Sequence, residues 1–255
     1  MLERTSDKLV REEYTLPPIV IEIANLEGPR GLFDFIRRYG ISNRYTTRVI
    51  YTTLFKPLLD RSVALVFLIL LSPLLLLIGL AIYLDSGRPI ILSQDRVGRG
   101  GSIIKIYKFR TMLQPEKWSD VGYDPDSMPH KMRDDPRVTK VGRILRKTSL
   151  DEIPQLLNVL KGDMSLVGPR PELPEIVERY QDWQHFRHLV KPGITGWWQV
   201  MGRSELPMHE NTELDIYYVL HQGIKLDIEI FIRTIWVVFS VKGLFRVQFS
   251  LRVKL

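Results

Sequence analysis

The fold class of this chain is decided by one apolar run, Ser62-Val-Ala-Leu-Val-Phe-Leu-Ile-Leu-Leu-Ser-Pro-Leu-Leu-Leu-Leu-Ile-Gly-Leu-Ala-Ile-Tyr-Leu84. The run carries no charge and is longer than the roughly 20 residues that a helix needs to cross the hydrocarbon core of a bilayer. The simplest interpretation is a helix that spans the membrane once.

Two features of this run favour a re-entrant helix, which enters and leaves on the same face, over a single span. Ser72-Pro73 lies in its middle, and a proline removes a backbone hydrogen bond and bends a helix. A single span normally carries its positive charges on the cytoplasmic side only. Here cations stand on both sides of the run, namely Lys56 and Arg61 before it and Arg88, Arg96 and Arg99 after it.

The composition sets the outer limits. The chain has 255 residues, of which 45% are hydrophobic, so it can bury a core of its own. Its net charge of +7 fits a nucleic acid, an anionic membrane surface or a phosphorylated substrate, and the apolar run favours the last two. The absence of cysteine excludes disulfides, thiolate nucleophiles and cysteine-bound zinc. The N-terminal residues contain no apolar h-region, so no cleaved signal peptide is expected.

We predict a mixed α/β fold that is mostly helical, with one re-entrant helix-break-helix and interfacial amphipathic helices. Residues 1–50 are expected to form a soluble extension, 51–90 the re-entrant region and 91–255 a catalytic domain on the cytoplasmic face. Two short strands are expected on either side of the turn at residues 98–101. Apolar spacing predicts a basic helix over 138–147 and another helix over 176–190, facing either lipid headgroups or the core. The apolar run 228–241 is expected to be a core or interfacial helix.

Adjacent carboxylates, Asp151 and Glu152, lie at the centre of the polar part of the chain. Ser149 to Glu152 matches a capping box, so these acids could simply stabilise the start of a helix. Their surroundings favour chemistry instead. Arg146 precedes them and Arg170 follows within a rigid Gly-Pro-Arg-Pro turn, and arginines can hold phosphate oxygens bidentately.

A carboxylate can attack phosphorus and form an acyl phosphate, which divides a difficult transfer into two steps. Asp151 is the expected nucleophile and Glu152 the expected ligand of a Mg²⁺ ion, which needs only one or two carboxylates besides substrate phosphates. Arg146, Arg170 and Arg203 would stabilise charge on the transferring group.

Ordered motifs over residues 56–241 resemble those of the bacterial sugar transferases, the monotopic polyprenol-phosphate phosphoglycosyl transferases. The motifs are Lys56 with Asp60, Ser72-Pro73, Gln94–Gly98, Tyr107–Met112, Thr148–Gln155, Gly168–Pro171 and Pro192–Gly196.

This resemblance implies that Asp151 attacks a UDP-sugar, releases UMP and passes the sugar phosphate to polyprenyl phosphate, usually undecaprenyl phosphate, to start exopolysaccharide, capsule or O-antigen assembly. It also implies Mg²⁺ at Glu152, a re-entrant helix bent at Ser72-Pro73, and the inner membrane of a bacterium as the location. Substrate phosphates would be held by cations at five positions: Arg146, Arg170, Arg203, and Lys108 and Arg110 of the Tyr107–Met112 motif.

Several alternatives stay open at this point. An inactive, membrane-anchored scaffold of a polysaccharide assembly complex is the second hypothesis, although the intact Asp-Glu pair argues against it. No nucleic acid is expected as a partner, because no binding motif accompanies the charge. A homodimer remains open, and so does the sugar, with Trp198-Gln-Val and Gly202-Arg-Ser leaning towards a hexose.

Overall fold

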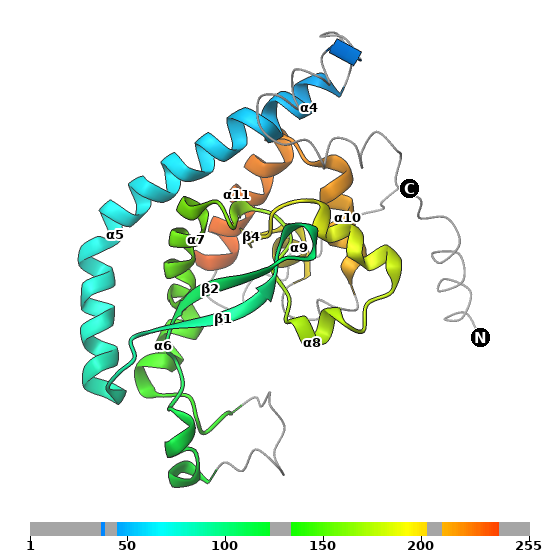
Figure 1. Ribbon diagram of the computed structural model, residues 1–255. Helices are drawn as coiled ribbons and strands as arrows, with labels where there is room; N and C mark the ends of the chain where they lie inside the picture. Colours follow the sequence, from blue (N-terminus) through cyan, green and yellow to red (C-terminus); the bar gives the residue numbers. More distant parts are fainter. Residues whose placement is uncertain (1–36, 39–44, 123–133, 203–210, 240–255) are drawn as a thin grey trace.

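The computed structural model describes residues 37–38, 45–122, 134–202 and 211–239, and the fold is mostly helical, as predicted (Figure 1). Most of the predicted extension, residues 1–50, lies outside the described part. The α-helices are α4 Thr46–Ile50, α5 Lys56–Ser86, α6 Lys140–Thr148, α7 Leu156–Lys161, α8 Pro174–Val177, α9 Trp197–Gly202, α10 Thr212–His221 and α11 Ile224–Phe239. The strands are β1 Ile91–Val97, β2 Ile103–Phe109, β3 Ser165–Val167 and β4 Gly193–Thr195.

One continuous helix contains the apolar run. It begins with α4, passes through a π-helical turn at Tyr51–Phe55 and continues as α5 to Ser86. Its 41 residues include a window with a mean hydropathy of 3.0, of which only 17% is buried against the rest of the protein. By length and composition this helix could cross a membrane, and many of its leucines are exposed, as expected for side chains that face lipid.

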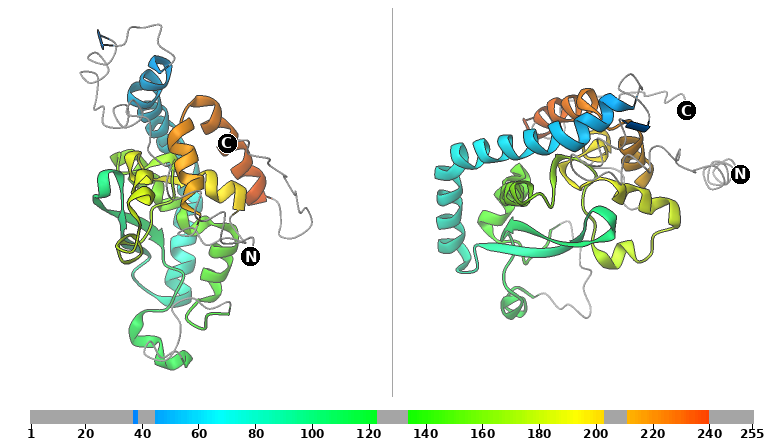
Figure 2. Two further views of the ribbon diagram at one scale, coloured as in Figure 1. Left: turned by 90° about the vertical axis from the view of Figure 1, so that its right-hand side faces the viewer. Right: turned by 45° about the horizontal axis from the view of Figure 1, so that its top comes forward.

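The helix remains helical at Ser72-Pro73 but loses one backbone bond there. Pro73 has no N–H to donate to the carbonyl of Ile69, four residues earlier. The Ser72 hydroxyl donates to that carbonyl instead, at 2.8 Å. Substitution by a side-chain hydroxyl is how a proline is tolerated where no water is at hand. Figures 1 and 2 both show α5 changing direction along its length as it curves around the rest of the protein.

The N-terminal part of α5 is bound to the globular body through Asp227 of α11. One carboxylate oxygen of Asp227 accepts from Lys56 and from the Tyr51 hydroxyl, both at 2.6 Å, and the other accepts from Tyr218 at 2.8 Å. Asp60, one turn further along α5, accepts from Ser165 at 2.6 Å. These buried bonds explain why polar residues open an otherwise apolar helix.

The C-terminal end of α5 is bound to the same globular body. Arg110 donates to the carbonyl oxygens of Gly87 (2.6 Å) and Arg88 (2.8 Å), just past the helix end, where a cation also complements the helix dipole. Ile78 and Ile82 pack against residues of β2 and α6. Both ends of the long helix therefore contact one body, while its middle is exposed.

The predicted strand pair is confirmed. β1 and β2 are antiparallel, with Ile91 opposite Phe109 and Val97 opposite Ile103, and they enclose the turn at 99–101. β3 and β4 form a second, parallel pair that the sequence analysis did not predict. The two strands are too short for a period of alternating side chains to show.

The prediction of one helix over 176–190 is wrong. The segment consists of α8 and a separate 3₁₀ segment, Asp182–Leu189, because Gln181 is extended and caps the second piece. This segment was expected to face either lipid headgroups or the core. Arg187 faces the core, since it is 2% exposed and pairs with Asp215 at 2.7 Å. The predicted helices over 138–147 and 228–241 are present as α6 and α11, the latter over its described residues.

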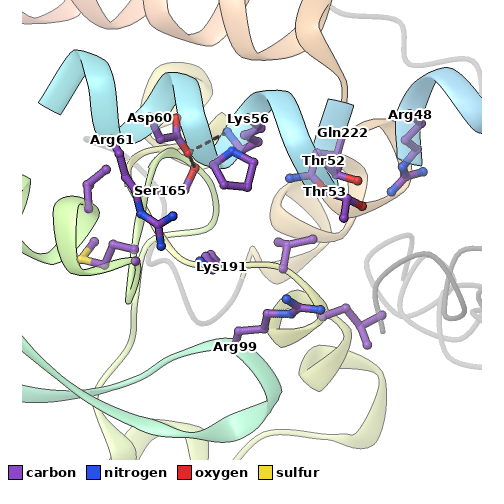
Figure 3. A pocket seen from close by; sticks show the side chains of 16 residues that line it. Arg48, Thr52, Thr53, Lys56, Asp60, Arg61, Arg99, Ser165, Lys191 and Gln222 are labelled. Atoms are coloured by element: carbon purple, nitrogen blue, oxygen red, sulfur yellow. Dashed lines mark hydrogen bonds and ion pairs between the residues drawn. The ribbon is translucent and has the colours of Figure 1, made fainter. Parts of the chain in front are cut away.

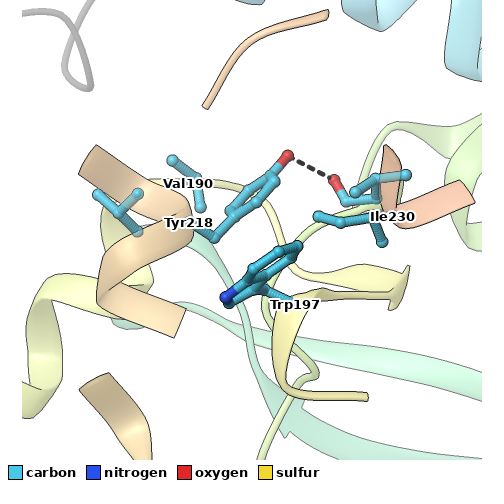
Figure 4. Close-up of a cluster of buried hydrophobic side chains, with 6 residues drawn as sticks. Val190, Trp197, Tyr218 and Ile230 are labelled. Atoms are coloured by element: carbon cyan, nitrogen blue, oxygen red, sulfur yellow. Dashed lines mark hydrogen bonds between the residues drawn. The ribbon is translucent and has the colours of Figure 1, made fainter. Parts of the chain in front are cut away.

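The core beneath the parallel strands is assembled from segments far apart in the sequence (Figure 4). Val190, Trp197, Tyr218 and Ile230 form one buried cluster, and the Tyr218 hydroxyl reaches the backbone of β3 at 3.0 Å. This cluster fixes α9, α10 and α11 against the strand that leads into Gly168-Pro-Arg-Pro171.

Candidate active site

The two central carboxylates lie in a 3₁₀ segment, Leu150–Gln155, between α6 and α7. Ser149 turns the chain between α6 and this segment through a left-handed conformation (φ 60°). A helical start was predicted here and is present, but the predicted capping box is wrong because Ser149 makes no capping bond. The side chain of Glu152 accepts from Arg170 instead of capping the segment.

Glu152 is held by two cations from different parts of the chain. Arg170 binds it bidentately, with nitrogen to oxygen distances of 2.5 and 3.1 Å. Lys108 of β2 approaches the same carboxylate at 3.5 Å. Burial lowers the pKa of Lys108, and the nearby Arg170 lowers it further, while Glu152 acts in the opposite direction. The fold thus gathers three of the predicted site residues into one ion cluster.

Asp151 stands beside this cluster and is half-buried. Its pKa is raised, first by burial and then by the charge of Glu152, while Lys108 and Arg146 partly oppose the rise. A partly desolvated carboxylate is a stronger nucleophile than a fully hydrated one, and the nearby cations favour its ionised form. Asp151 has no ion pair with a described residue that would occupy it.

The remaining predicted cations divide into three cases. Arg146 is exposed near Asp151, where its Nε donates to Thr111 at 2.8 Å. Arg110 is not brought to the carboxylates, since its guanidinium is buried at the C-terminal end of α5. Sequence position alone could not separate Arg110 from Lys108, because two residues two apart in an extended segment are expected on one face. Lys108 lies in β2 and Arg110 follows the end of that strand, and only the packing shows that they have different partners. Arg203 lies outside the described residues.

Two supporting ion pairs were missed by the sequence analysis. Arg96 of β1 lies 3.7 Å from Glu172, which follows the Gly-Pro-Arg-Pro turn. Arg187 donates to the backbone carbonyl of Arg170 at 2.5 Å and so fixes the residue that holds Glu152. Burial raises the pKa of Asp215, the partner of Arg187, to about 6 even though Arg187 opposes the rise. No spacing rule links these residues, so no sequence signal could have found them.

An apolar groove of about 240 Å³ is lined by Glu152 and by residues of the two apolar helices, α5 and α11. Ser149 and Glu152 line its polar end. Val63 and Phe67 of α5, together with Phe231 of α11, line its apolar part. A ligand with a charged head and a hydrocarbon tail would match both ends of this groove.

The residues present are compatible with a magnesium ion, although they form no ready-made cage. No group of three or more metal-binding side chains occurs in the described part of the chain. Asp151 and Glu152 supply the hard oxygen donors that Mg²⁺ prefers, and Mg²⁺ commonly completes its shell with water and substrate phosphate. Because both oxygens of Glu152 face Arg170, metal binding requires Glu152 to share them.

Comparison with known proteins gives a consistent set of similarities. The family model described as bacterial sugar transferase matches residues 51–241. The chain is 41% identical over 189 residues to the uncharacterized sugar transferase EpsL of Bacillus subtilis, which covers 74% of this chain and 89% of that protein. It is 42% identical over 188 residues to the undecaprenyl-phosphate galactose phosphotransferase of Salmonella typhimurium, covering 71% and 39% respectively. It is also 42% identical over 185 residues to the UDP-glucose:undecaprenyl-phosphate glucose-1-phosphate transferase of Escherichia coli, covering 69% and 38%. The chain therefore spans less than half the length of these last two relatives.

Proposed function

Because the chain belongs to the bacterial sugar transferase family, we propose that it transfers a sugar-1-phosphate group from a UDP-sugar to polyprenyl phosphate. The family assignment confirms the predicted transferase class. One observation carries the proposal: Glu152, which neighbours Asp151 and pairs with Arg170 and Lys108, lines a groove whose apolar wall includes Val63 and Phe67 of the membrane-type helix α5.

In the first step, the Asp151 carboxylate attacks the β-phosphorus of the UDP-sugar. A bond forms between the carboxylate oxygen and phosphorus, the diphosphate bridge breaks, and UMP leaves with the bridging oxygen. Lys108, Arg146 and Arg170 stabilise the negative charge on the transferring phosphoryl oxygens. Burial and then Glu152 raise the pKa of Asp151, and Lys108 and Arg146 oppose this rise, so these two cations also help to keep Asp151 ionised.

In the second step, a phosphate oxygen of polyprenyl phosphate attacks the same phosphorus. The bond to Asp151 breaks, the carboxylate is restored, and the product is a polyprenyl diphosphate sugar. The groove supports this step because its hydrocarbon-lined part would hold the first isoprene units while the lipid phosphate reaches Asp151. A bound Mg²⁺ would supply charge neutralisation between the anionic nucleophiles and the diphosphate.

We propose that α5 is re-entrant and lies on the cytoplasmic face of the inner membrane, and the contacts of its two ends support the re-entrant part of this proposal. The Lys56 end and the Arg110-bound end both contact the same globular body, so a bilayer between them would have to separate parts that are in contact. Labelling of single cysteines placed at Lys56 and Arg88 in this cysteine-free chain tests the arrangement. Equal access from the cytoplasmic side supports it, and access from opposite sides rules it out.

The test of the reaction is Asp151→Asn in purified enzyme with a UDP-sugar, polyprenyl phosphate and Mg²⁺. UMP release and lipid product should both fall by at least about 1,000-fold, because the amide cannot form the acyl phosphate. Asp120→Asn, an exposed carboxylate at a distance in sequence, is the matched control and should retain full turnover. Full turnover in Asp151→Asn would disprove the nucleophile assignment. A wild-type protein without turnover on any UDP-sugar would instead favour the inactive scaffold.

A panel of UDP-sugars in the same assay identifies the donor. A hexose is proposed, because relatives are named as galactose and glucose phosphotransferases and the Trp198-Gln-Val sequence leans in that direction. An enzyme that uses only an N-acetylated donor would reject this choice and leave the transfer itself intact.

A further inference from the structure

A second cavity, of about 380 Å³, lies on the N-terminal side of α5 and is separate from the carboxylates (Figure 3). Its lining contains five cationic side chains, namely Arg48, Lys56, Arg61, Arg99 and Lys191. Asp60 is the one acidic residue of the lining, and it already accepts from Ser165 and lies 3.7 Å from Lys56. None of the residues in the Glu152–Arg170–Lys108 cluster lines this cavity.

Two of these cations have no direct partner among the described residues, although the charges of Asp60 and Asp163 act on one of them, Lys191, and raise its pKa against the larger effect of burial. Lys56 is paired with Asp227, and Arg48 donates to carbonyl oxygens at the end of α10. Within the described residues, Arg61 and Lys191 form neither a hydrogen bond nor an ion pair.

Arg61 and Lys191 nevertheless converge on one point of the backbone. A Cβ atom on Gly162 would lie 2.5 Å from the Arg61 guanidinium and 3.6 Å from the Lys191 ammonium nitrogen. Gly162 has a φ of +88° and ends α7, so the turn leaves open the space that the two cations share. Burial lowers the pKa of Lys191, and the charges of Arg61 and Arg99 lower it further. Like charges held together in this way repel, and a bound anion would relieve the repulsion.

The position of the cavity fits a ligand that arrives at the membrane surface. Thr52 and Thr53, which line it, supply hydroxyl groups from the helical turn just before Lys56. On the same stretch of helix, Phe55 is 62% exposed and Leu58 is 67% exposed, as expected for side chains that face lipid. The cavity therefore opens where polar headgroups meet apolar surface.

We propose that this cavity is a second anion site, in which Arg61 and Lys191 bind a phosphate group. Arg61 provides a planar fork for two phosphate oxygens and Lys191 a compact point charge, which together match one tetrahedral anion. The phosphate belongs either to the headgroup of an anionic lipid or to a soluble phosphate compound, and both present the same group to these side chains. The site is separate from the proposed transfer reaction, because it contains none of the residues assigned to that reaction.

Calorimetric titration of the purified protein in neutral detergent tests the proposal with two probes. Dihexanoyl phosphatidylglycerol carries the lipid phosphate, and glycerol 1-phosphate carries a phosphate without a tail. The double variant Arg61→Gln/Lys191→Gln should weaken binding of at least one probe by tenfold or more. Arg170→Gln, which alters the carboxylate cluster, should bind as wild type does. Lys117→Gln/Arg179→Gln removes the same charge from exposed positions outside the cavity and is the matched control.

The outcomes separate the alternatives. Loss of binding only in the double variant supports the site, and the swapped variant Arg61→Lys/Lys191→Arg should then retain binding, which distinguishes lost charge from lost folding. Binding of the lipid probe alone identifies a headgroup, and equal binding of both probes identifies the phosphate group itself. If Arg170→Gln loses binding and the double variant retains it, or if all variants bind equally, the cavity is not the site.

Discussion

The Glu152–Arg170–Lys108 cluster and the Arg61–Lys191 cavity are both rich in cations. The cations of the cluster pair directly with a carboxylate, whereas Arg61 and Lys191 do not. In the first, a half-buried carboxylate already neutralises the cations, and Arg170 binds it bidentately. In the second, two cations stand together and the nearby acid is engaged with other residues. The difference indicates that the first cluster is pre-organised around its own carboxylate, whereas the second has cations without a direct partner that an outside anion can bind.

This comparison also explains why the two regions should respond differently to mutation. Removing a member of a paired, buried cluster leaves an uncompensated charge, which is costly. Removing a cation that has no partner costs little folding free energy and can even relieve repulsion. Folding and activity can therefore be perturbed separately in the two regions.

The largest effect is expected from Asp227→Asn. This change removes the nearer of the two carboxylates beside Lys56, which is 5% exposed, and leaves only Asp60 at 3.7 Å, so it should lower the free energy of unfolding by about 3 kcal/mol. Arg61→Gln, in the wall of the same cavity, should change it by less than about 1 kcal/mol. Denaturant unfolding in detergent measures both.

As a control on α11, Glu229→Gln breaks an exposed pair with Arg233 and should also cost less than about 1 kcal/mol. Equal losses in all three variants would remove the distinction between paired and unpaired cations.

The next effect concerns turnover and uses substitutions that preserve charge. Arg170→Lys keeps a cation beside Glu152 but loses the bidentate geometry, so UMP release should fall by about 100-fold. Arg61→Lys makes the same exchange in the cavity and should change turnover by less than about threefold. A similar loss in both variants would mean that the cavity takes part in the transfer step.

A smaller effect is expected from His188, a buried histidine whose surroundings disfavour its protonated form. Burial and then the charges of Arg187 and His185 lower its pKa to about 3. Between pH 6.5 and about 3 the unfolded chain binds a proton at this residue that the folded chain does not. Stability should therefore fall as the pH drops, by about 1.4 kcal/mol per pH unit from this residue.

Unfolding free energies at pH 7, 6 and 5 check the His188 prediction. The decline should be shallower in His188→Phe, whereas a change at the exposed His221, His221→Phe, should leave it as in the wild type. Identical slopes in wild type and His188→Phe would show that the ring does not resist protonation.

The smallest effect is a shift in one titration midpoint. Burial and the charge of Glu152 raise the pKa of Asp151, so Glu152→Gln should lower that pKa by removing the second cause. NMR titration of protein carrying ¹³C-labelled aspartate measures the midpoint, and Asp151→Asn identifies the signal. An unchanged or higher pKa in Glu152→Gln would contradict the electrostatic account of this carboxylate pair.

Particular elements show how far the sequence could predict this arrangement. The apolar helix, its Ser72-Pro73 position and the strand pair around residues 98–101 follow from local composition, and the structure contains all three. The pairing of β3 with β4 was not predictable in this way. Strands of three residues carry no readable period, and their partners lie far apart in the chain.

The candidate site was also predictable from the sequence only in part. Asp151, Glu152 and Arg170 could be selected from the sequence because acids and arginines cluster there within short motifs. Their roles as ion partners could not, and the predicted capping box failed because the Glu152 side chain pairs with Arg170 across 18 positions of chain. Arg110 failed to join the cluster for a related reason: it satisfies carbonyl oxygens at the end of a helix that local sequence cannot place beside it.

The sequence by itself determined that the protein has a long apolar helix, an adjacent pair of reactive carboxylates and an excess of cations, because these are properties of residues and their immediate neighbours. Only the tertiary structure decided which cations meet a carboxylate and which are left together without one. Charge interactions depend on distance and burial, and both are set by contacts such as Lys56 with Asp227 and Arg61 above Gly162, which join segments that the chain order keeps apart.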